Sequence, residues 1–571
     1  MTTIRLSDLG ILPDTDITLA LFELFKKNSS DTEFVFENAD YFFSPSELLR
    51  EDLRVTNSDI IPYRSLAVFM KNMKNCTLRG NGARLWFSGQ VQAFTLDHCE
   101  NVTVDGFTVN WKKPLVAEGR VLSRDGSLVD VFIDPERFPH KFENGRLLFD
   151  VGADEWYDFT GRSIVFEPHS LRARRGVDDV MLSPVEALGE GVYRMKSNGI
   201  KDIRVGDLIN LRHNSRIHAG FFLEKCTDVT LSNVTVHSCG GLGCVVQFCR
   251  NFKGKGVHFI PDFASGRLVS SGRDDGFQIV SCSGEVCITE CTFHALMDDP
   301  INVHGCCVSV GEVLDSHTLR CRFMHPQAGG FHYWAECGDE IAFIVKDTME
   351  TVGKATAAGY RLEDTYTFLL TLSEPLPDAL SEIAASGGLA LDNLTHTPSF
   401  ICSKNRFGSC RARGLLVSTP RKVVICDNYF ESSGSAILIS GDSNGWFESG
   451  ACHDVEITRN VFTDACMGSS YEFCEGVISI CPIIPKPDAE KPYHRGIRIT
   501  DNVFDAARTP VLYAFSCDGL TFCDNRIFSS PSLGEVKSDP SLIRLSYCRN
   551  VKIGDNDWVG DFGCREGSDY E

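Results

Sequence analysis

The chain has 571 residues, of which 43% are hydrophobic and 23% are charged, an ordinary composition for a globular protein. Its formal net charge of −21 argues against nucleic acid and anionic membranes as partners, because both are bound through basic surfaces. The same charge disfavours a polyanionic substrate, unless a local basic patch overrides the total. The length allows about three or four domains, or one elongated architecture.

The 24 cysteines include no C-x-x-C pair, which excludes zinc-ribbon and thioredoxin-type motifs. Many stand in apolar stretches such as residues 281–291, where cysteine acts as a small buried hydrophobe, and we interpret them as reduced thiols. The N-terminal residues show no signal peptide, and no apolar run reaches the roughly 18 residues of a membrane span. We therefore expect a cytoplasmic protein, or a secreted or periplasmic one if a leader was removed.

Near the N-terminus, the segment DITLALFELFKKN (residues 16–28) is typical of a short amphipathic helix. Asp16 stands before its first turn and Lys26 and Lys27 lie in its last turn, an arrangement that suits the helix dipole. We expect this helix to cover the open edge of the first β-sheet layer, which otherwise invites aggregation.

A short phrase recurs along the chain: a β-type triplet, a polar residue, an asparagine, and then an aromatic residue or valine. Asn405 and Asn428 are 23 residues apart, and so are Asn502 and Asn525. Short strands broken by Gly, Asn, Asp and Ser at this spacing are typical of a β-solenoid, whose stacked coils share one core. The alternative is a β-sandwich, but the recurring phrase favours the solenoid. The copies lie at residues 399–407, 423–430, 455–462, 497–504, 520–528 and 551–556, with looser ones at 94–110 and 221–237.

Two regions lack this phrase and alternate like antiparallel strands, and each contains a Gly-Asp phrase, RVGDLINL or ECGDEIAFI. We infer two similar antiparallel β subdomains inserted into the solenoid, where insertions beside a groove usually form its walls. The expected division is a cap with first coils (1–113), a first insertion (114–210), coils with an acidic cluster (211–308), a second insertion (309–391) and C-terminal coils (392–571).

Two acidic pairs carry the functional hypothesis: Asp274-Asp275 in SGRDDGFQIV and Asp298-Asp299 in HALMDDPINVHG. Asp275 and Asp298 are 23 residues apart, so we expect them on adjacent coils about 4.8 Å apart, at one place on the circumference. Carboxyl groups roughly 5–9 Å apart would suit either class of glycosidase. Mutual repulsion would keep one of them protonated and another ionised. The alternative is structural turn aspartates or a calcium site.

Four further residues are candidates for substrate binding. Trp446 and Glu448 lie in a Gly/Ser-rich loop, where an aromatic ring and a carboxylate suit the face and the hydroxyls of a sugar. His304 and His325 would orient a carboxylate or bind a hydroxyl, although a structural role is the simpler interpretation of each.

Arg411 and Arg413, in the segment CRARGLLVS, are expected to pair with acids on neighbouring coils. No nucleophile-elbow, P-loop, H-E-x-x-H or dinucleotide-binding motif occurs in a suitable context, so we expect neither a cofactor nor a metal.

Residues 271–305, 325–331, 411–430 and 436–450 resemble glycoside hydrolase family 110, whose members are α-1,3-galactosidases, including enzymes that remove blood-group B galactose. The resemblance covers nearly the whole chain. It implies an all-β fold, a right-handed parallel β-helix with two β-barrel-like insertions, and an inverting, metal-independent exo-hydrolase. The catalytic residues are expected to be Asp298, Asp275 and Asp299. The expected substrate-binding residues are Asp274, His304, His325, Arg411, Trp446 and Glu448.

Within this set we assign Asp298 as the general acid, and Asp275 or Asp299 as the residue that activates water. Two positions depart from the family pattern, because Asn110 stands where an aspartate is expected and Gln278 where a histidine is expected. The expected partner is a galactose-terminated oligosaccharide; the oligomeric state is open, with a dimer as one alternative. The competing interpretations are a uronan hydrolase, whose motifs the chain lacks, and a non-catalytic carbohydrate-binding solenoid.

Overall fold

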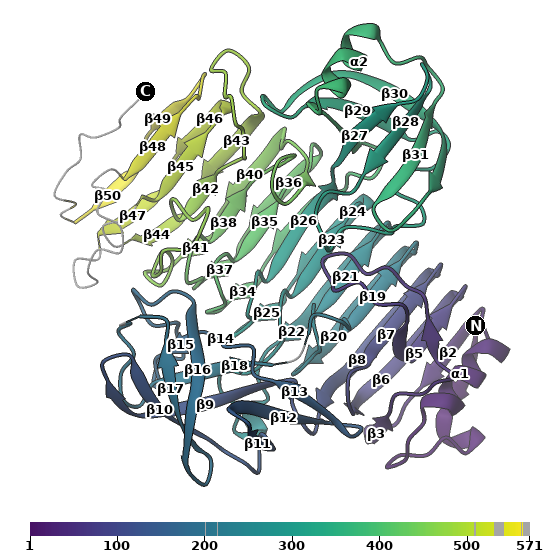
Figure 1. Cartoon of the computed structure of the whole chain (residues 1–571), viewed down its shortest axis with the longest axis vertical. Helices are drawn as coiled ribbons and strands as arrows, with labels where there is room; N and C mark the ends of the chain where they lie inside the picture. The colour runs from purple at the N-terminus through teal and green to yellow at the C-terminus, as the bar shows by residue number, and fades with distance from the viewer. Residues whose placement is uncertain (200, 214, 507–509, 530–541, 561, 563–571) are drawn as a thin grey trace.

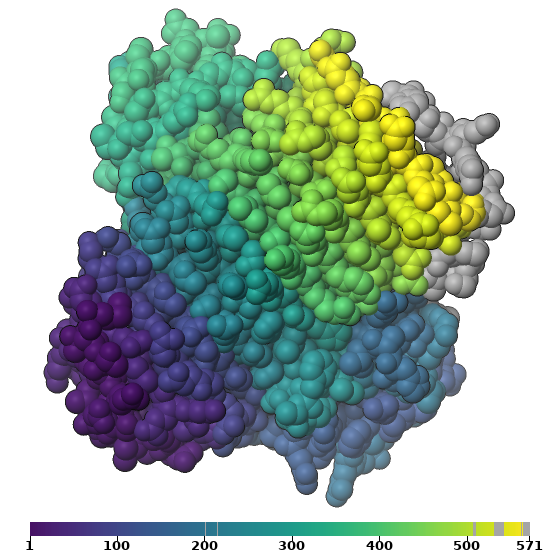
Figure 2. All heavy atoms as spheres, turned by 180° about the vertical axis from the view of Figure 1, so that it is seen from behind, coloured from purple at the N-terminus to yellow at the C-terminus, as the bar shows by residue number. Residues whose placement is uncertain are grey.

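The computed structural model describes residues 1–562 except 200, 214, 507–509, 530–541 and 561. Its body is a parallel β-helix, as predicted, in which successive coils follow one another along the molecule (Figure 1). Seen from behind, the surface passes in order from the N-terminal coils to the C-terminal coils, as stacking in chain order requires (Figure 2). In the described residues, one sheet of the solenoid has 21 strands and the other has 13.

The 13-stranded sheet forms the floor of the site described below. Its parallel strands are β5 (Arg64–Lys71), β7 (Gln92–Asp97), β19 (Phe221–Glu224), β21 (Cys244–Gln247), β23 (Phe277–Val280), β26 (Ile301–Cys306), β35 (Leu415–Val417), β38 (Ile437–Ile439), β42 (Ile478–Ile480), β45 (Leu512–Phe515) and β48 (Ile543–Ser546).

The 21-stranded sheet covers the other side of the shared core. Its longer strands are β6 (Lys74–Phe87), β8 (Glu100–Trp111), β20 (Thr227–Val236), β22 (Arg250–Phe259), β24 (Ser283–Thr289), β33 (Ser399–Ser403), β36 (Lys422–Cys426), β40 (Asp454–Thr458), β43 (His494–Thr500) and β46 (Cys517–Cys523).

The recurring phrase forms two ladders inside the solenoid. Its aromatic residues stack from coil to coil, with ring centroids between 4.4 and 5.9 Å apart along Phe259, Phe293, Phe407, Phe430, Phe462 and Phe504. Val423 and Ile425 point into the core and are fully buried, as predicted. Burying such side chains is the main favourable contribution to folding, because each coil removes the apolar face of its neighbour from water.

The asparagines of the phrase form the second ladder, which continues through Asn405, Asn428, Asn460, Asn502 and Asn525. Each side-chain amide donates to the carboxamide oxygen of the next asparagine, at 3.0, 2.9, 3.0 and 3.1 Å. The same oxygen also accepts the backbone N–H of the preceding asparagine. An asparagine suits this turn because it supplies one donor and one acceptor to adjacent coils.

The N-terminal helix α1 (Thr18–Lys27) confirms the predicted cap. Leu21, Leu24 and Phe25 are buried in the core, and the ring of Phe22 stacks on Phe69 of β5 at a centroid distance of 6.0 Å. The side chain of Asp16 accepts the backbone N–H of Thr18 at 3.0 Å. No helix in the described residues has both the length and the apolar character needed to cross a membrane.

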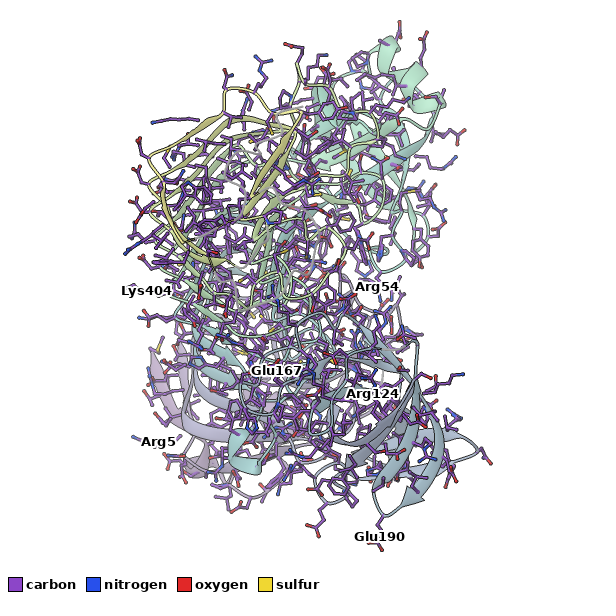
Figure 3. All side chains as sticks on the ribbon, turned by 90° about the vertical axis from the view of Figure 1, so that its left-hand side faces the viewer. Arg5, Arg54, Arg124, Glu167, Glu190 and Lys404 are labelled. Carbon is purple, nitrogen blue, oxygen red and sulfur yellow. The ribbon has the colours of Figure 1, made fainter. Side chains whose placement is uncertain are left out.

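Two antiparallel β domains interrupt the solenoid, as predicted, and lie at opposite ends of Figure 1. Barrel I contains β9 (Val116–Asp125) to β18 (Leu208–Arg212), which form a seven-stranded and a three-stranded sheet. Its hairpin β16–β17 (Val180–Gly189 and Val192–Ser197) projects away from the coils, with Glu190 at the tip (Figure 3). Barrel II is a closed six-stranded barrel from β27 (Val308–Val313) to β32 (Leu389–Asn393), with helix α2 (Asp378–Ala385).

We predict that Asn460→Ala lowers the free energy of unfolding by about 2–4 kcal/mol, because buried polar groups that lose their partners cost about 1–3 kcal/mol each. The substitution removes the acceptor of Asn428 and the donor to the carbonyl of Ile425. Urea unfolding followed by circular dichroism measures the change. Arg459→Ala is the control, because Arg459 is exposed and its ion pair with Asp427 lies at the surface, where such pairs contribute little. Equal stability of the two variants would contradict a structural role for the ladder.

Candidate active site

The two acidic pairs lie on neighbouring coils, immediately before β23 and β26. In the parallel register of these strands Phe277 pairs with Ile301, so each residue aligns with the one 24 positions later. Asp275 is therefore level with Asp299, and not with Asp298 as the 23-residue spacing suggested. The reason is that coil length varies: successive asparagines of the ladder are also separated by 32 and 42 residues. The two acidic pairs still lie at one site, because both members of each pair lie at the same turn.

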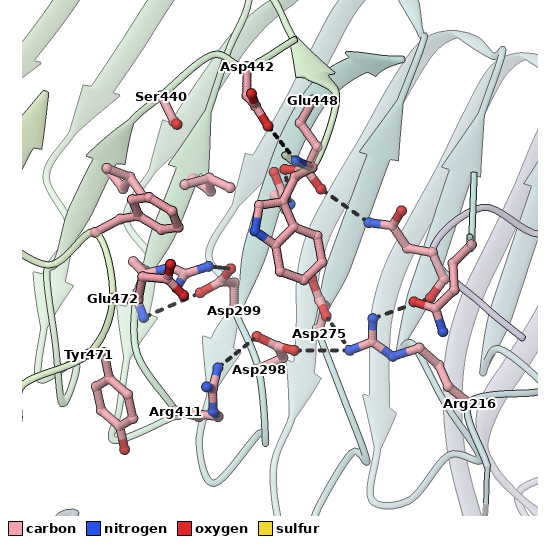
Figure 4. A pocket seen from close by; sticks show the side chains of 18 of the residues that line it. Arg216, Asp275, Asp298, Asp299, Arg411, Ser440, Asp442, Glu448, Tyr471 and Glu472 are labelled. Carbon is pink, nitrogen blue, oxygen red and sulfur yellow. Dashed lines mark hydrogen bonds and ion pairs between the residues drawn. The ribbon is translucent and has the colours of Figure 1, made fainter. Parts of the chain in front are cut away.

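These residues open into a cavity of about 590 Å³ on the outer face of the 13-stranded sheet (Figure 4). Asp275, Asp298 and Asp299 lie on its floor. Its walls come from five separate parts of the chain: an N-terminal loop, barrel I, a loop of barrel II, the segment around β39 (Glu448–Ser449) and a C-terminal loop. The wall residues include Asn57, Asp59, Thr160, Arg162, Gln327, Asp442, Trp446, Glu448, Tyr471, Glu472 and Phe473.

Arg216 joins the two acidic pairs. One nitrogen of its guanidinium, Nη2, lies 2.9 Å from a carboxylate oxygen of Asp298, 3.6 Å from one of Asp275 and 3.0 Å from one of Asp274. The nearest oxygens of Asp275 and Asp298 are therefore no farther apart than the sum of the first two distances, about 6.5 Å. Both carboxyl groups thus face the same space and lie within reach of a single monosaccharide.

Two further arginines come from the next coil, as predicted for acids on neighbouring coils. Arg413 aligns with Asp299 and contacts its carboxylate at 2.9 Å, and Arg411 lies 3.5 Å from Asp298. Arg411 is itself held by Asp179 of barrel I through contacts of 2.7 to 3.1 Å. Burying carboxylates is expensive unless cations accompany them. Here the cations come from the next coil, and one of them, Arg411, is held by a carboxylate of barrel I.

The surroundings separate the three carboxyl groups by proton affinity. Burial raises the pKa of Asp275 well above its usual range, and the neighbouring Asp298 adds to this effect. Burial also raises the pKa of Asp299 to about 6, against the opposing charge of Arg413. For Asp298, burial is outweighed by the surrounding arginines, which lower its pKa below the usual range. The site therefore places a carboxyl group that favours its ionised form beside one that favours its protonated form.

Asp274 was predicted to bind substrate, and the structure contradicts this. Its side chain has no exposed surface, and it is not among the residues that line the cavity. It forms ion pairs with Arg212, with Arg216 at 3.0 Å and with Arg273 at 2.7 Å. Asp274 therefore lies behind the cavity surface, where it neutralises and orients three arginines that do line the cavity.

The two histidines are also placed differently from the prediction, because neither lines the cavity. His304 is buried, and its Nε2 lies 2.7 Å from Nε2 of Gln278 and 3.5 Å from a carboxylate oxygen of Glu448. The ring of His325 stacks on Trp446 with centroids 5.0 Å apart. Both histidines thus support residues that do line the cavity, as the structural interpretation of each required.

Of the residues predicted to bind substrate, Trp446, Glu448 and Arg411 line the cavity. Trp446 is 51% exposed, so one face of its indole ring is open to a ligand while His325 covers the other. Glu448 accepts hydrogen bonds from the side chains of Asn57 at 3.3 Å and Asn302 at 3.2 Å.

Asn110 and Gln278, the two residues that depart from the family pattern, do not line the cavity. Asn110 is buried, donates to Asp262 at 2.9 Å and accepts from Arg267 at 2.8 Å. Gln278 is buried against His304 and also lies outside the cavity lining. Both residues therefore belong to internal polar networks.

Sequence reasoning missed the arginines of the floor and most of the walls. Arg212 and Arg216 stand in no recognisable motif, and the two acids that Arg216 contacts are 58 and 82 residues away along the chain. Arg273 directly precedes the pair Asp274-Asp275 but was not singled out. Among the arginines of the site, only Arg411 and Arg413 were singled out from the sequence. They stand at alternate positions shortly after the copy of the recurring phrase at residues 399–407. In the described residues, no group of three or more His, Cys, Asp or Glu side chains is arranged to hold a metal ion.

Two family models match the regions of the two inserted barrels. The model of GLAA-B beta-barrel domain I matches residues 117–209, and that of GLAA-B beta-barrel domain II matches residues 318–383. Among solved structures, a family 28 exopolygalacturonase of Yersinia enterocolitica covers 97% of this chain and 78% of its own, at 11% identity and a TM-score of 0.39.

Curated relatives are similar over nearly the whole chain. Alpha-1,3-galactosidase B of Bacteroides thetaiotaomicron is 38% identical over 98% of this chain and 91% of its own length. Alpha-1,3-galactosidase B of Phocaeicola vulgatus is 30% identical over 97% of this chain and 94% of its own length. Identity at this level over both the solenoid and the two inserted barrels shows that the chain is a glycoside hydrolase and belongs to glycoside hydrolase family 110, the family of the α-1,3-galactosidases.

Proposed function

We propose that the enzyme removes terminal α-1,3-linked galactose from oligosaccharides or glycoconjugates, by exo-action and with inversion, and that the blood-group B antigen is among its substrates. The names of the relatives support the bond and the sugar. The observation that carries the chemistry is the meeting of Asp275, Asp298 and Asp299 in one cavity. The surroundings raise the pKa of Asp275 and lower that of Asp298.

The walls of the cavity support exo-action. Elements from both barrels and from two loops surround the floor, whereas an enzyme that cuts within a polymer needs an open groove along which the chain continues on both sides. A terminal galactose fits with its reducing side toward the mouth, where Trp446 offers an aromatic face to the next sugar.

The pKa shifts of Asp275 and Asp298 indicate which of them acts as the acid and which as the base. A general acid must hold a proton before the reaction, and a general base must be ionised. This condition favours Asp275 as the acid that protonates the glycosidic oxygen. It favours Asp298, which Arg216 and Arg411 keep ionised, as the base that takes a proton from water. These roles reverse the assignment made from the sequence, in which Asp298 was the acid.

Hydrolysis then takes place in a single displacement at the anomeric carbon. The acid gives its proton to the glycosidic oxygen as the bond to the anomeric carbon breaks, and water attacks that carbon from the opposite face while the base accepts its proton. The oxocarbenium-like charge that develops on the sugar is stabilised by the remaining carboxylates. Galactose leaves as its β anomer.

We predict that wild-type enzyme incubated with α-1,3-galactobiose releases β-galactose first, as seen by time-resolved proton NMR. Asp275→Asn and Asp298→Asn should each lower turnover by about 10²–10⁴-fold with circular dichroism unchanged, because acid–base groups supply that much. A fucosylated B-type trisaccharide in a parallel reaction tests tolerance of the branch. Release of α-galactose first would refute inversion, and near-normal activity of both variants would refute the site.

Leaving-group dependence separates the acid from the base. A dinitrophenyl α-galactoside needs no protonation, so we predict that Asp275→Asn loses far less activity on it than on galactobiose. Asp298→Asn should be impaired on both substrates and should recover with azide, giving β-galactosyl azide. The reverse pattern would restore the assignment of Asp298 as the acid.

The pKa values also predict opposite effects on stability. The pKa of Asp299 rises from 3.8 in the unfolded chain to about 6 in the folded one, so the native state binds the proton more tightly and stability falls as pH rises through this window. A tenfold change in proton affinity corresponds to about 1.4 kcal/mol. Asp299→Asn should therefore gain about 3 kcal/mol relative to wild type between pH 4 and pH 7, measured by urea unfolding.

Asp298→Asn is the matched counterpart, because the pKa of Asp298 is lowered and its ionised form stabilises the fold. Relative to wild type, this variant should lose stability as pH rises from the acid side. The same trend in both variants would contradict the separation of the carboxyl groups by proton affinity.

A further inference from the structure

A second cavity, of about 650 Å³, is lined by residues of barrel II and by solenoid residues next to β36, β40 and β43. It is distinct from the active site but borders it: Trp446 and Glu448 line the first cavity, whereas Gly450 and Ala451 line the second. The floor of the second cavity includes Asp392, which is buried and accepts a hydrogen bond from Ser449 at 2.7 Å, and the ring of Tyr493.

Three basic side chains stand in register along one wall. Lys422 pairs with Asp454, so Arg421 is level with His453 on the next coil. Val455 pairs with Ile497, so His453, two residues earlier, is level with Arg495 on the coil after that. With coils about 4.8 Å apart, the two arginines are about 10 Å apart and the histidine lies between them. Nη2 of Arg495 lies 3.3 Å from Nδ1 of His453.

The charges around this cavity do not cancel. Its two lysines are neutralised, because Lys354 contacts Glu340 at 2.7 Å and Lys491 contacts Glu350 at 3.0 Å. Among the described residues, the guanidinium of Arg421 is bonded to the hydroxyl of Thr397 and to a backbone carbonyl, and that of Arg495 to His453.

Within the part of the chain that the structure describes, neither arginine has an acidic partner. The two arginines, two coils apart, repel each other, and among the described residues neither touches a carboxylate that would offset this repulsion. Burial, with smaller contributions from the charges of Arg495 and Lys354, lowers the pKa of His453 to about 4, so this ring favours its neutral form.

We propose that this second cavity binds a negatively charged sugar, with Arg421 and Arg495 as the partners of its carboxylate, sulfate or phosphate group. Guanidinium groups bind such anions through paired, charge-assisted hydrogen bonds. The carboxyl groups of Glu340 and Asp392 and the neutral ring of His453 offer partners for hydroxyls, and the prolines Pro420 and Pro492 offer apolar contact. The site provides the local basic patch that lets an acidic protein hold an acidic glycan.

The proposal concerns binding and does not rest on the proposed hydrolytic function. The probes are galacturonate, galactose 6-sulfate and galactose 6-phosphate, compared with uncharged galactose by isothermal titration of the full chain. The charged sugars are expected to bind at least tenfold more tightly than galactose, and more weakly at high salt because screening weakens exposed charges. The ranking of the three probes identifies the anionic group.

The test variant is Arg421→Gln combined with Arg495→Gln. The matched control, Lys253→Gln combined with Lys404→Gln, removes the same charge from exposed residues on other turns; Lys404 points away from the coils in Figure 3. The test variant should lose at least tenfold in affinity for the charged probe, the control should keep it, and both should hydrolyse a neutral galactoside within twofold of wild type. Unchanged affinity in the test variant, an equal loss in the control, or no preference for charged sugars in the wild type would overturn the proposal.

Discussion

Parallel register between coils is the constraint on which the rest of this molecule depends. Because every strand pairs with the same strand of the next coil, any residue type that recurs at one position becomes a continuous column through the structure. The asparagine and phenylalanine ladders are such columns, and they bury polar and apolar groups in matched sets. The same constraint aligns Asp275, Asp299 and Arg413 on three successive coils, so scaffold and site follow from one geometric rule.

The active site shows how the fold tolerates buried charge. Three buried carboxyl groups at one turn position would strongly destabilise the fold if they had no partners. Arginines from an adjacent coil and from the segment that follows barrel I form ion pairs with them. The arginines are not distributed equally among the acids. Asp298 receives Arg216 and Arg411, which lower its pKa, while Asp275 is more deeply buried and has a raised pKa. Unequal pairing thus separates the proton affinities of the two groups.

The inserted barrels contribute to this balance beyond forming walls. Asp179 of barrel I holds Arg411, so an inserted domain helps to set the charge beside Asp298. Barrel II contributes Gln327, which bonds Asp59 at 2.9 Å and so ties the N-terminal loop to the cavity. The junction of barrel II with the solenoid also creates the second cavity, whose basic wall again arises from residues in register on three coils.

The sequence by itself determined the features that repeat or are local. The solenoid, its capping helix, the two insertions and the meeting of the acidic pairs could be predicted, because strand alternation, helix signals and a recurring phrase depend only on near neighbours along the chain. The resemblance of four segments identified the family. Tertiary structure decided which aspartate is level with which, since coil lengths vary and one residue changes the alignment. It also decided that Asp274, His304 and His325 lie behind the cavity surface and that Arg216 joins the acids. Those contacts join residues tens to hundreds of positions apart, and no local pattern in the chain records them.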